Sequence, residues 1–161
     1  EGTYPLPEAQ RDRFMTRITM GYPSRDSELE MLERHGAHNP LDELYPVTHG
    51  ERITELIDVV GSVYVADVVK DYLVNIVAAT RSHDAVRLGA SPRASLHLIR
   101  TARAKAALAG RDYVIPDDVQ AMAIPVLAHR LLPSTRAQLD GISPVDIVSQ
   151  ILTSTPVPEQ A

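Results

Sequence analysis

The clearest pattern of apolar and polar positions lies in the middle of the chain. Apolar or aromatic side chains recur there at helical spacing, at Val65, Val68, Val69, Tyr72, Leu73, Ile76 and Val77. Residues three or four apart share one face of an α-helix, so this spacing places them together. β-branched residues favour strands, but a run this long with a period near 3.6 outweighs that propensity. The pattern predicts a buried helix.

Three later helices are predicted from their first residues. Ser91-Pro92 places a serine at the N-cap and a proline at the first helical position, and Gly110 ends the Ala/Leu/Arg-rich run that follows. Pro116-Asp117-Asp118 begins a second helix, with both acids in the first turn where they complement the helix dipole. Ser143-Pro144 begins a third, which runs to about Thr153. We expect Asp117 and Asp118 to be capping residues.

The N-terminal part predicts mostly irregular chain with one short strand. Gly2, Pro5 and Pro7 indicate a loop, with at most one helical turn near residues 7–10. Apolar and polar residues alternate from Phe14 to Met20, which predicts a strand that ends at Gly21-Tyr22-Pro23. No neighbouring strand is predicted elsewhere in the chain, so this strand would expose its hydrogen-bonding edge. We therefore expect the first 22 or so residues to be disordered or paired with a second copy.

Two helices are expected between that strand and the central helix. Ser24 is placed to cap a helix that ends at about Arg34, with Leu29 and Leu32 as its buried stripe. Residues 36–45 predict a loop. A second helix then carries the apolar residues Ile53, Leu56, Ile57 and Val60. The expected fold is thus mainly α, with a helical bundle over 23–161 after a loop and one strand over 1–22.

Composition narrows the class of protein. With 161 residues, 44% hydrophobic and 23% charged, the chain is globular and is long enough for one domain of usual size. A formal charge of −5 argues against bulk attraction to nucleic acid or to an anionic membrane. Cysteine is absent, which excludes disulfides and thiolate metal sites. His35 and His38 are three apart, but Gly36 breaks any helix that would align them, so no metal site is expected.

The sequence also suggests where the protein is found. No run of about 18 apolar residues exists, and the first residues lack the basic and apolar regions of a signal peptide. We expect a cytoplasmic protein without a membrane partner. The chain opens with Glu1 rather than Met, in a polar loop, so we expect it to be part of a longer protein.

Two motifs resemble the MoxR family of AAA+ ATPases. They are EGTYPLPEAQRDRF at residues 1–14 and LGASPRA at residues 88–94. Supporting matches, in the same order along the chain, are GYPS at 21–24, GRDYV at 110–114, PDDV at 116–119 and VLAHRL at 126–131. The resemblance implies that residues 1–22 end an α/β ATPase core and that residues 23–161 form its α-helical lid.

The resemblance also assigns roles to two arginines. Arg13 matches the family's arginine finger, a catalytic residue that reaches the ATP bound by a neighbouring subunit. A permanently charged planar fork can stabilise the charge that builds on phosphoryl oxygens in the transition state. Arg93 matches the sensor-2 arginine, which binds the ATP phosphates from the base of a lid helix. Related AAA+ groups differ in whether this arginine serves its own or a neighbouring subunit, and the sequence leaves both open.

Simpler interpretations of the two arginines are also possible. Arg13 would then form only a surface ion pair with Asp12 or Glu8. Arg93 would be a solvated arginine in a first helical turn, where a positive charge is slightly unfavourable.

The chain lacks the parts that bind a nucleotide. It holds no G-x-x-x-x-G-K-[ST] loop to bind phosphates and no separate acidic strand for Mg²⁺. The family's sensor-1 residue would lie before Glu1. We therefore expect this chain alone to bind a nucleotide weakly or not at all, with no ATP or Mg²⁺ as a bound cofactor, and not to hydrolyse ATP. The resemblance implies both cofactors and ATP hydrolysis for the full-length protein.

The resemblance further implies partners. It points to a homo-oligomeric, hexameric ring that remodels or matures protein complexes, with protein clients and von Willebrand-type partner proteins, and in some members to metal-cofactor insertion. The alternative is a free-standing helical module that binds protein or DNA without a nucleotide. Arg93, Arg100 and Arg103 would then form a basic stripe along one helix, although the net charge of −5 makes nonspecific nucleic-acid binding unfavourable.

Overall fold

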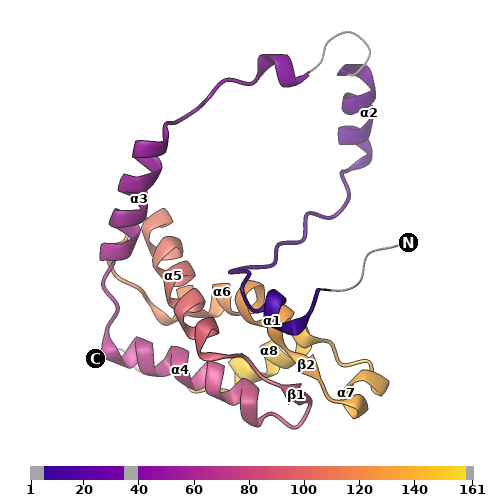
Figure 1. The fold of residues 1–161 in the computed structure, drawn as a ribbon, viewed down its shortest axis with the longest axis vertical. Coiled ribbons are helices and arrows are strands. Elements are labelled where there is room, and N and C mark those ends of the chain that lie inside the picture. The colour runs from indigo at the N-terminus through magenta and orange to yellow at the C-terminus, as the bar shows by residue number, and fades with distance from the viewer. Residues whose placement is uncertain (1–5, 35–39, 159–161) are drawn as a thin grey trace. The chain divides into compact units, whose positions relative to one another are not determined.

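The computed structural model describes residues 6–34 and 40–158, and most of them are helical (Figure 1). The chain divides into two compact units. One comprises residues 1–17 and 58–161, and the other comprises residues 18–57.

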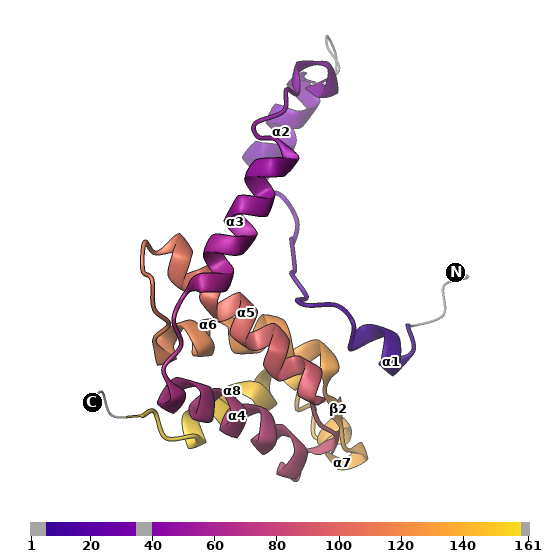
Figure 2. The ribbon, with the colours of Figure 1, turned by 60° about the vertical axis from the view of Figure 1, so that its left-hand side comes forward.

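Four helices form the core of the first unit. They are α4 (Asp67–Ser82), α5 (Pro92–Leu108), α6 (Pro116–Leu127) and α8 (Pro144–Ser154), and together with their connections over 58–158 they are called the helical body (Figures 1 and 2). Fully buried Leu98 and Val119 represent its core. Ala94, Ala102 and Ala106 on α5 are fully buried, and so is Ala123 on α6. Short side chains allow α5 and α6 to approach closely.

The helices predicted for this unit are confirmed. The periodic segment forms α4, with Tyr72, Leu73 and Ile76 buried. It begins at Asp67, and Val65 is buried in the chain just before it. Val68, expected on the buried face, is 48% exposed. Helices α5, α6 and α8 begin at the three expected prolines. Proline cannot donate a backbone N–H, and the first helical turn is where that loss costs nothing.

Several short connections were not predicted. Strand β1 (Val86–Leu88) pairs antiparallel with β2 (Leu132–Pro133), a 3₁₀ helix η2 (Ala128–Arg130) follows α6, and α7 (Thr135–Leu139) precedes α8. Tyr64 also bridges to the segment before α6, since its N–H donates to Asp112 O at 2.8 Å and its carbonyl accepts from Val114 N at 2.9 Å. These pairings join residues far apart in sequence, which local patterns do not encode.

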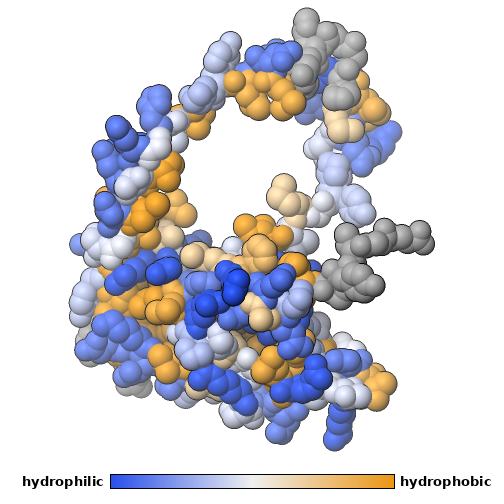
Figure 3. Space-filling model, viewed as in Figure 1, coloured by the Kyte–Doolittle hydropathy of each residue, from blue (hydrophilic) through white to orange (hydrophobic). Residues whose placement is uncertain are grey.

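The second unit contains α2 (Arg25–Arg34), the 3₁₀ helix η1 (Pro40–Glu43) and the first part of α3 (Gly50–Ser62). Helix α2 has the predicted bounds. The predicted buried stripe is wrong, because Leu29 is 43% and Leu32 67% exposed. No residue of α2 is buried, so none of the described residues of its unit covers it. Apolar side chains of the unit are accordingly visible at the surface (Figure 3).

The strand predicted over 14–20 is absent. A strand needs a neighbour to pair its backbone groups, and the described chain provides none beside these residues. Instead, Arg17 N–H donates to Pro125 O at 2.9 Å and Phe14 O accepts from the Arg130 side chain. The expectation of a disordered or copy-paired N-terminal segment is therefore wrong for residues 12–17, which bind the helical body of their own chain.

Candidate functional site

The segment that carries Arg13 begins with a short helix. Helix α1 (Glu8–Arg11) confirms the expected turn, and its end is tightened by Arg13 N–H donating to Gln10 O at 3.1 Å. The Arg13 side chain is exposed and makes no hydrogen bond or ion pair within the described part of the chain. Its suggested partners are engaged elsewhere, since Glu8 lies 3.7 Å from Arg87 and Asp12 binds the helical body. The surface ion pair of Arg13 does not form.

Asp12 joins this segment to two parts of the helical body. The Ser91 hydroxyl lies 3.0 Å from Oδ1 and 2.9 Å from Oδ2 of the Asp12 carboxylate. Arg130 Nε donates to Oδ1 at 3.2 Å, and Arg93 Nη1 lies 3.8 Å from Oδ2. A hydroxyl and two guanidinium groups thus surround one carboxylate. The aspartate next to the predicted finger therefore contacts the predicted sensor-2 arginine.

Ser91 occupies the predicted N-cap position of α5 but does not cap it with its side chain. The hydroxyl points to Asp12 instead, while the Ser91 carbonyl accepts from Ala94 N–H at 2.9 Å. Pro92 fixes the backbone of the first turn without needing a donor. The serine therefore connects the start of α5 to the N-terminal segment.

Gly89 allows the chain to pass close to the end of α4. A Cβ atom at this position would lie 2.6 Å from Thr80 O and 2.7 Å from Arg81 Cα, closer than real Cβ contacts. The close approach lets Ala90 N–H donate to Thr80 Oγ1 at 3.0 Å and lets Ala90 O accept from Arg81 Nε at 2.8 Å. These bonds fix the chain just before α5, and so determine where Arg93 lies.

Arg93 is on the first turn of α5, and its side chain is 48% exposed. Its only negative neighbour in the described structure is Asp12, at 3.8 Å, which is long for an ion pair. Because Asp12 also accepts from Arg130, one carboxylate faces two guanidinium groups. The groups around Arg93 therefore carry more positive than negative charge, which favours binding of an anion. The basic stripe along α5 is interrupted, because Arg100 is exposed but Arg103 is partly buried.

Arg130 lies at the end of η2, and its side chain is only 1% exposed. Beside Asp12 Oδ1, it donates to the main-chain oxygens of Asp12 at 3.2 Å, Phe14 at 2.5 Å and Met15 at 3.3 Å. It also donates to Val126 O within its own helical turn. A buried charge is tolerated where its donors are paired, and this one is paired mainly with the segment around Arg13.

Two buried histidines complete the surroundings of Arg130. Its Nη2 lies 2.5 Å from His97 Nδ1, and its Nη1 lies 3.0 Å from His129 Nε2. An arginine nitrogen can only donate, so His97 Nδ1 accepts and the ring is neutral. Burial and, after it, the charge of Arg130 lower the pKa of both histidines from their ordinary value of 6.5. The two rings remain uncharged near neutral pH.

Asp118 has a structural role, because it fixes the loop before α6. Both carboxylate oxygens bind Arg111, at 2.6 and 2.7 Å, and Oδ2 also accepts from Ile115 N–H at 3.0 Å. Burial alone would raise the pKa of Asp118, but these hydrogen bonds lower it overall. The expected capping role of Asp118 is confirmed.

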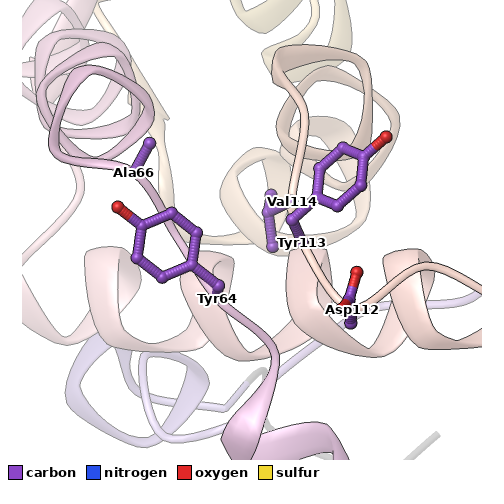
Figure 4. Close-up of a pocket in the computed structure, with 5 residues that line it drawn as sticks. All are labelled: Tyr64, Ala66, Asp112, Tyr113 and Val114. Carbon is purple, nitrogen blue, oxygen red and sulfur yellow. The ribbon is translucent and has the colours of Figure 1, made fainter.

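A hollow of about 350 Å³ lies beside the Tyr64 bridge (Figure 4). It is lined by Tyr64, Ala66, Asp112, Tyr113 and Val114. None of these side chains is cationic and one is an aspartate, so the hollow does not suit a phosphate. The positive site around Arg93 is built from other residues.

Within residues 6–34 and 40–158, no three His, Cys, Asp or Glu side chains are grouped to bind a metal ion. The same residues include no helix with the length and apolar character needed to cross a membrane.

The sequence suggested roles for Arg13 and Arg93 but not the contacts that connect their two segments. Asp12, Ser91 and Arg130 all lay inside the quoted motifs, but Asp12 was expected at most to pair with Arg13, Ser91 was expected to cap a helix, and Arg130 had no expected role. A charged residue in an otherwise apolar run, such as Arg130 after Val126 and Leu127, was the available signal, because such a residue needs a buried partner.

Comparison with known proteins gives consistent similarities. Residues 78–151 match the AAA lid domain. The chain is 45% identical over 160 residues to the uncharacterized protein YeaC of Bacillus subtilis, covering 99% of this chain and 50% of that protein. It is 39% identical over 168 residues to the chaperone MoxR1 of Mycobacterium tuberculosis, covering 99% and 44%.

A solved structure shows the same fold. The crystal structure of a candidate ATPase from Cytophaga hutchinsonii superposes with a TM-score of 0.90 at 33% identity, covering 99% of this chain and 51% of that one. This chain therefore spans about half the length of the proteins it matches.

Proposed function

Because this chain is a MoxR-family AAA+ sequence with an AAA lid domain, we propose that it supplies two phosphate-binding arginines to an ATP-hydrolysing site of the full-length protein. Arg13 is the arginine finger and Arg93 is the sensor-2 residue. ATP and Mg²⁺ are held by a core that this chain lacks, and the Mg²⁺ and both arginines neutralise the charge on the transferred phosphoryl group.

One observation carries the proposal. Asp12, the residue before Arg13, lies 3.8 Å from the Arg93 guanidinium. Both arginine side chains are exposed. The residue before one predicted phosphate ligand thus contacts the other, although Arg13 and Arg93 are 80 positions apart (93 − 13). This supports a common target, and we propose that both reach the ATP of one neighbouring subunit.

The full-length protein would then work as a homo-oligomeric ring, six subunits in the form we propose. An arginine finger requires a neighbour, so hydrolysis depends on assembly. We propose chaperone-like remodelling or maturation of protein complexes as the use of that energy, with von Willebrand-type proteins among the partners. The relative named as a chaperone supports this choice.

The roles are tested by replacing each arginine in the full-length protein. Arg13→Ala should lower kcat by about three orders of magnitude, the lower end of what such fingers contribute, while ATP affinity changes little. Arg93→Ala should weaken ATP binding as well as hydrolysis. Arg136→Ala is the control, since its side chain is 93% exposed and pairs only with Asp140. Unchanged hydrolysis in both Arg13→Ala and Arg93→Ala would refute the proposal.

Mixed rings decide which subunit Arg93 serves. Arg13→Ala and Arg93→Ala subunits are combined in equal amounts and ATP hydrolysis is measured. If both arginines act on the same neighbouring ATP, no interface has a complete set and activity stays low. If Arg93 serves its own subunit, some interfaces become complete and activity recovers.

A further inference from the structure

Arg130 binds the chain on both sides of Arg13. Its Nη2 donates to the carbonyl of Asp12, one residue before Arg13, at 3.2 Å, and to the carbonyl of Phe14, one residue after, at 2.5 Å. Nη1 donates to Met15 O at 3.3 Å. These carbonyls lie outside regular secondary structure and face the helical body. The backbone at Arg13 is therefore fixed from both sides by one buried side chain.

The chemistry of this arrangement requires arginine. A guanidinium has five N–H donors in a rigid plane, which the surrounding carbonyls and the carboxylate share, whereas a lysine ammonium has three donors at one point. The charge is compensated by Asp12, whose carboxylate accepts from Arg130 Nε at 3.2 Å. Asp12 also accepts from Ser91 at the start of α5. The backbone segment around Arg13 is thus connected to the helix that carries Arg93.

We infer that Arg130 is a positioning residue for Arg13: its hydrogen bonds to the carbonyls of Asp12, Phe14 and Met15 fix the backbone from which Arg13 reaches the neighbouring subunit's ATP. The inference rests on the proposed function for the role of Arg13. Arg130 is buried and does not touch the nucleotide itself. It acts on the rate of hydrolysis only through the placement of Arg13.

The first test is a double-mutant cycle in the full-length protein. Arg130→Lys should lower kcat on the order of 100-fold, since a displacement of about 1 Å at a catalytic group costs that much, with little change in KM for ATP. On an Arg13→Ala background, the same substitution should lower kcat less than about twofold, because the group it positions is already gone. Arg136→Lys is the matched control on an exposed arginine and should leave kcat unchanged.

A second variant keeps the inference testable if Arg130→Lys fails to fold. Asp12 is partly exposed, and Asp12→Asn keeps the shape of the side chain while it removes the charge and replaces one acceptor oxygen with an NH₂ donor. It should also lower kcat, and most of that loss should disappear without Arg13; a loss that remains acts through Arg93, which Asp12 also contacts. Asp140→Asn is its control, because Asp140, just after α7, makes an exposed ion pair with Arg136.

The second test follows the segment itself by hydrogen exchange. The amides of Arg13, Phe14 and Arg17 are hydrogen-bonded to Gln10 O, Arg11 O and Pro125 O. Arg130→Lys should speed their exchange on the order of tenfold, while amides in the middle of α5 change less than about twofold. Unchanged exchange at these three amides, or equal acceleration throughout α5, would overturn the inference.

The two proposals fail in different ways. A loss of kcat in Arg130→Lys that is equally large with and without Arg13 would overturn positioning, while the loss in Arg13→Ala alone would still support the finger. Normal hydrolysis in Arg13→Ala would overturn the finger, and with it the positioning of a catalytic group by Arg130. A local acceleration of exchange together with a non-additive loss of kcat is the result that supports the inference.

Discussion

Replacing Gly89 with alanine should destabilise the helical body, because the new methyl group has no space. The Cβ would lie 2.6 Å from Thr80 O, 2.7 Å from Arg81 Cα and 2.8 Å from Arg81 N. All three are backbone atoms near the end of α4, so they cannot rotate away as a flexible side chain could. Reaching even 3.0 Å from the oxygen requires a shift of 0.4 Å (3.0 − 2.6) between two segments that are hydrogen-bonded to each other.

The cost follows from two contributions. Overpacking by one methyl group costs about 1–3 kcal/mol. Moving the segment also weakens the bond from Ala90 N–H to Thr80 Oγ1, 3.0 Å long and buried, which contributes about 1 kcal/mol. We expect the free energy of unfolding to fall by about 2–4 kcal/mol, and Tm by about 10 °C for a chain of this size.

Thermal unfolding followed by far-UV circular dichroism measures this effect. Gly61→Ala is the matched control, since no atom lies within 4 Å of its Cβ and the residue is in α3. Alanine there should leave Tm unchanged or raise it slightly, because glycine in a helix costs about 0.5–1 kcal/mol relative to alanine. Equal Tm values for wild type and Gly89→Ala would show that the close approach is not a constraint on this segment.

Two further predictions concern the titratable residues Asp118 and His97. Asp118→Ala should lower the free energy of unfolding in urea by about 2 kcal/mol, because it removes the carboxylate that binds Arg111 and Ile115 N–H; an unchanged midpoint would contradict the structural role of this pair. Burial, and then the charge of Arg130, lower the pKa of His97 from 6.5, so below that pH the unfolded chain takes up a proton that the folded chain does not. Stability should therefore be fully present above about pH 6.5 and fall on acidification, and His97→Gln should flatten the fall of Tm between about pH 7 and pH 5. A Tm that rises on acidification over this interval would refute this account of His97.

The helices of the first unit could be predicted because their signals are local. Pro92, Pro116 and Pro144 begin α5, α6 and α8 as expected, since a first helical turn depends only on the residues in it. Leu29 and Leu32 show the limit of this reasoning. Their spacing gives α2 correctly, but periodicity indicates an apolar face without saying whether anything covers it.

Pairing across the chain was beyond sequence reasoning for the same reason. The alternation from Phe14 to Met20 is typical of a strand, but a strand forms only beside another, and here Phe14 O binds an arginine side chain instead. Arg13 and Arg93 could be recognised because they lie in compact motifs. The contact of Asp12 with Arg130 could not, because no short segment contains both residues.

The distance along the chain between Asp12 and Arg130, 118 residues, has a consequence during synthesis. Ribosomes add about 5–20 residues per second, so Asp12 is synthesised about 6–24 s before the arginine that binds it. Throughout that interval the carbonyls of Asp12, Phe14 and Met15 can bind only water or a transient partner. The contact between this segment and Arg130 is therefore one of the last parts of the structure to form, after most of the helices have been synthesised.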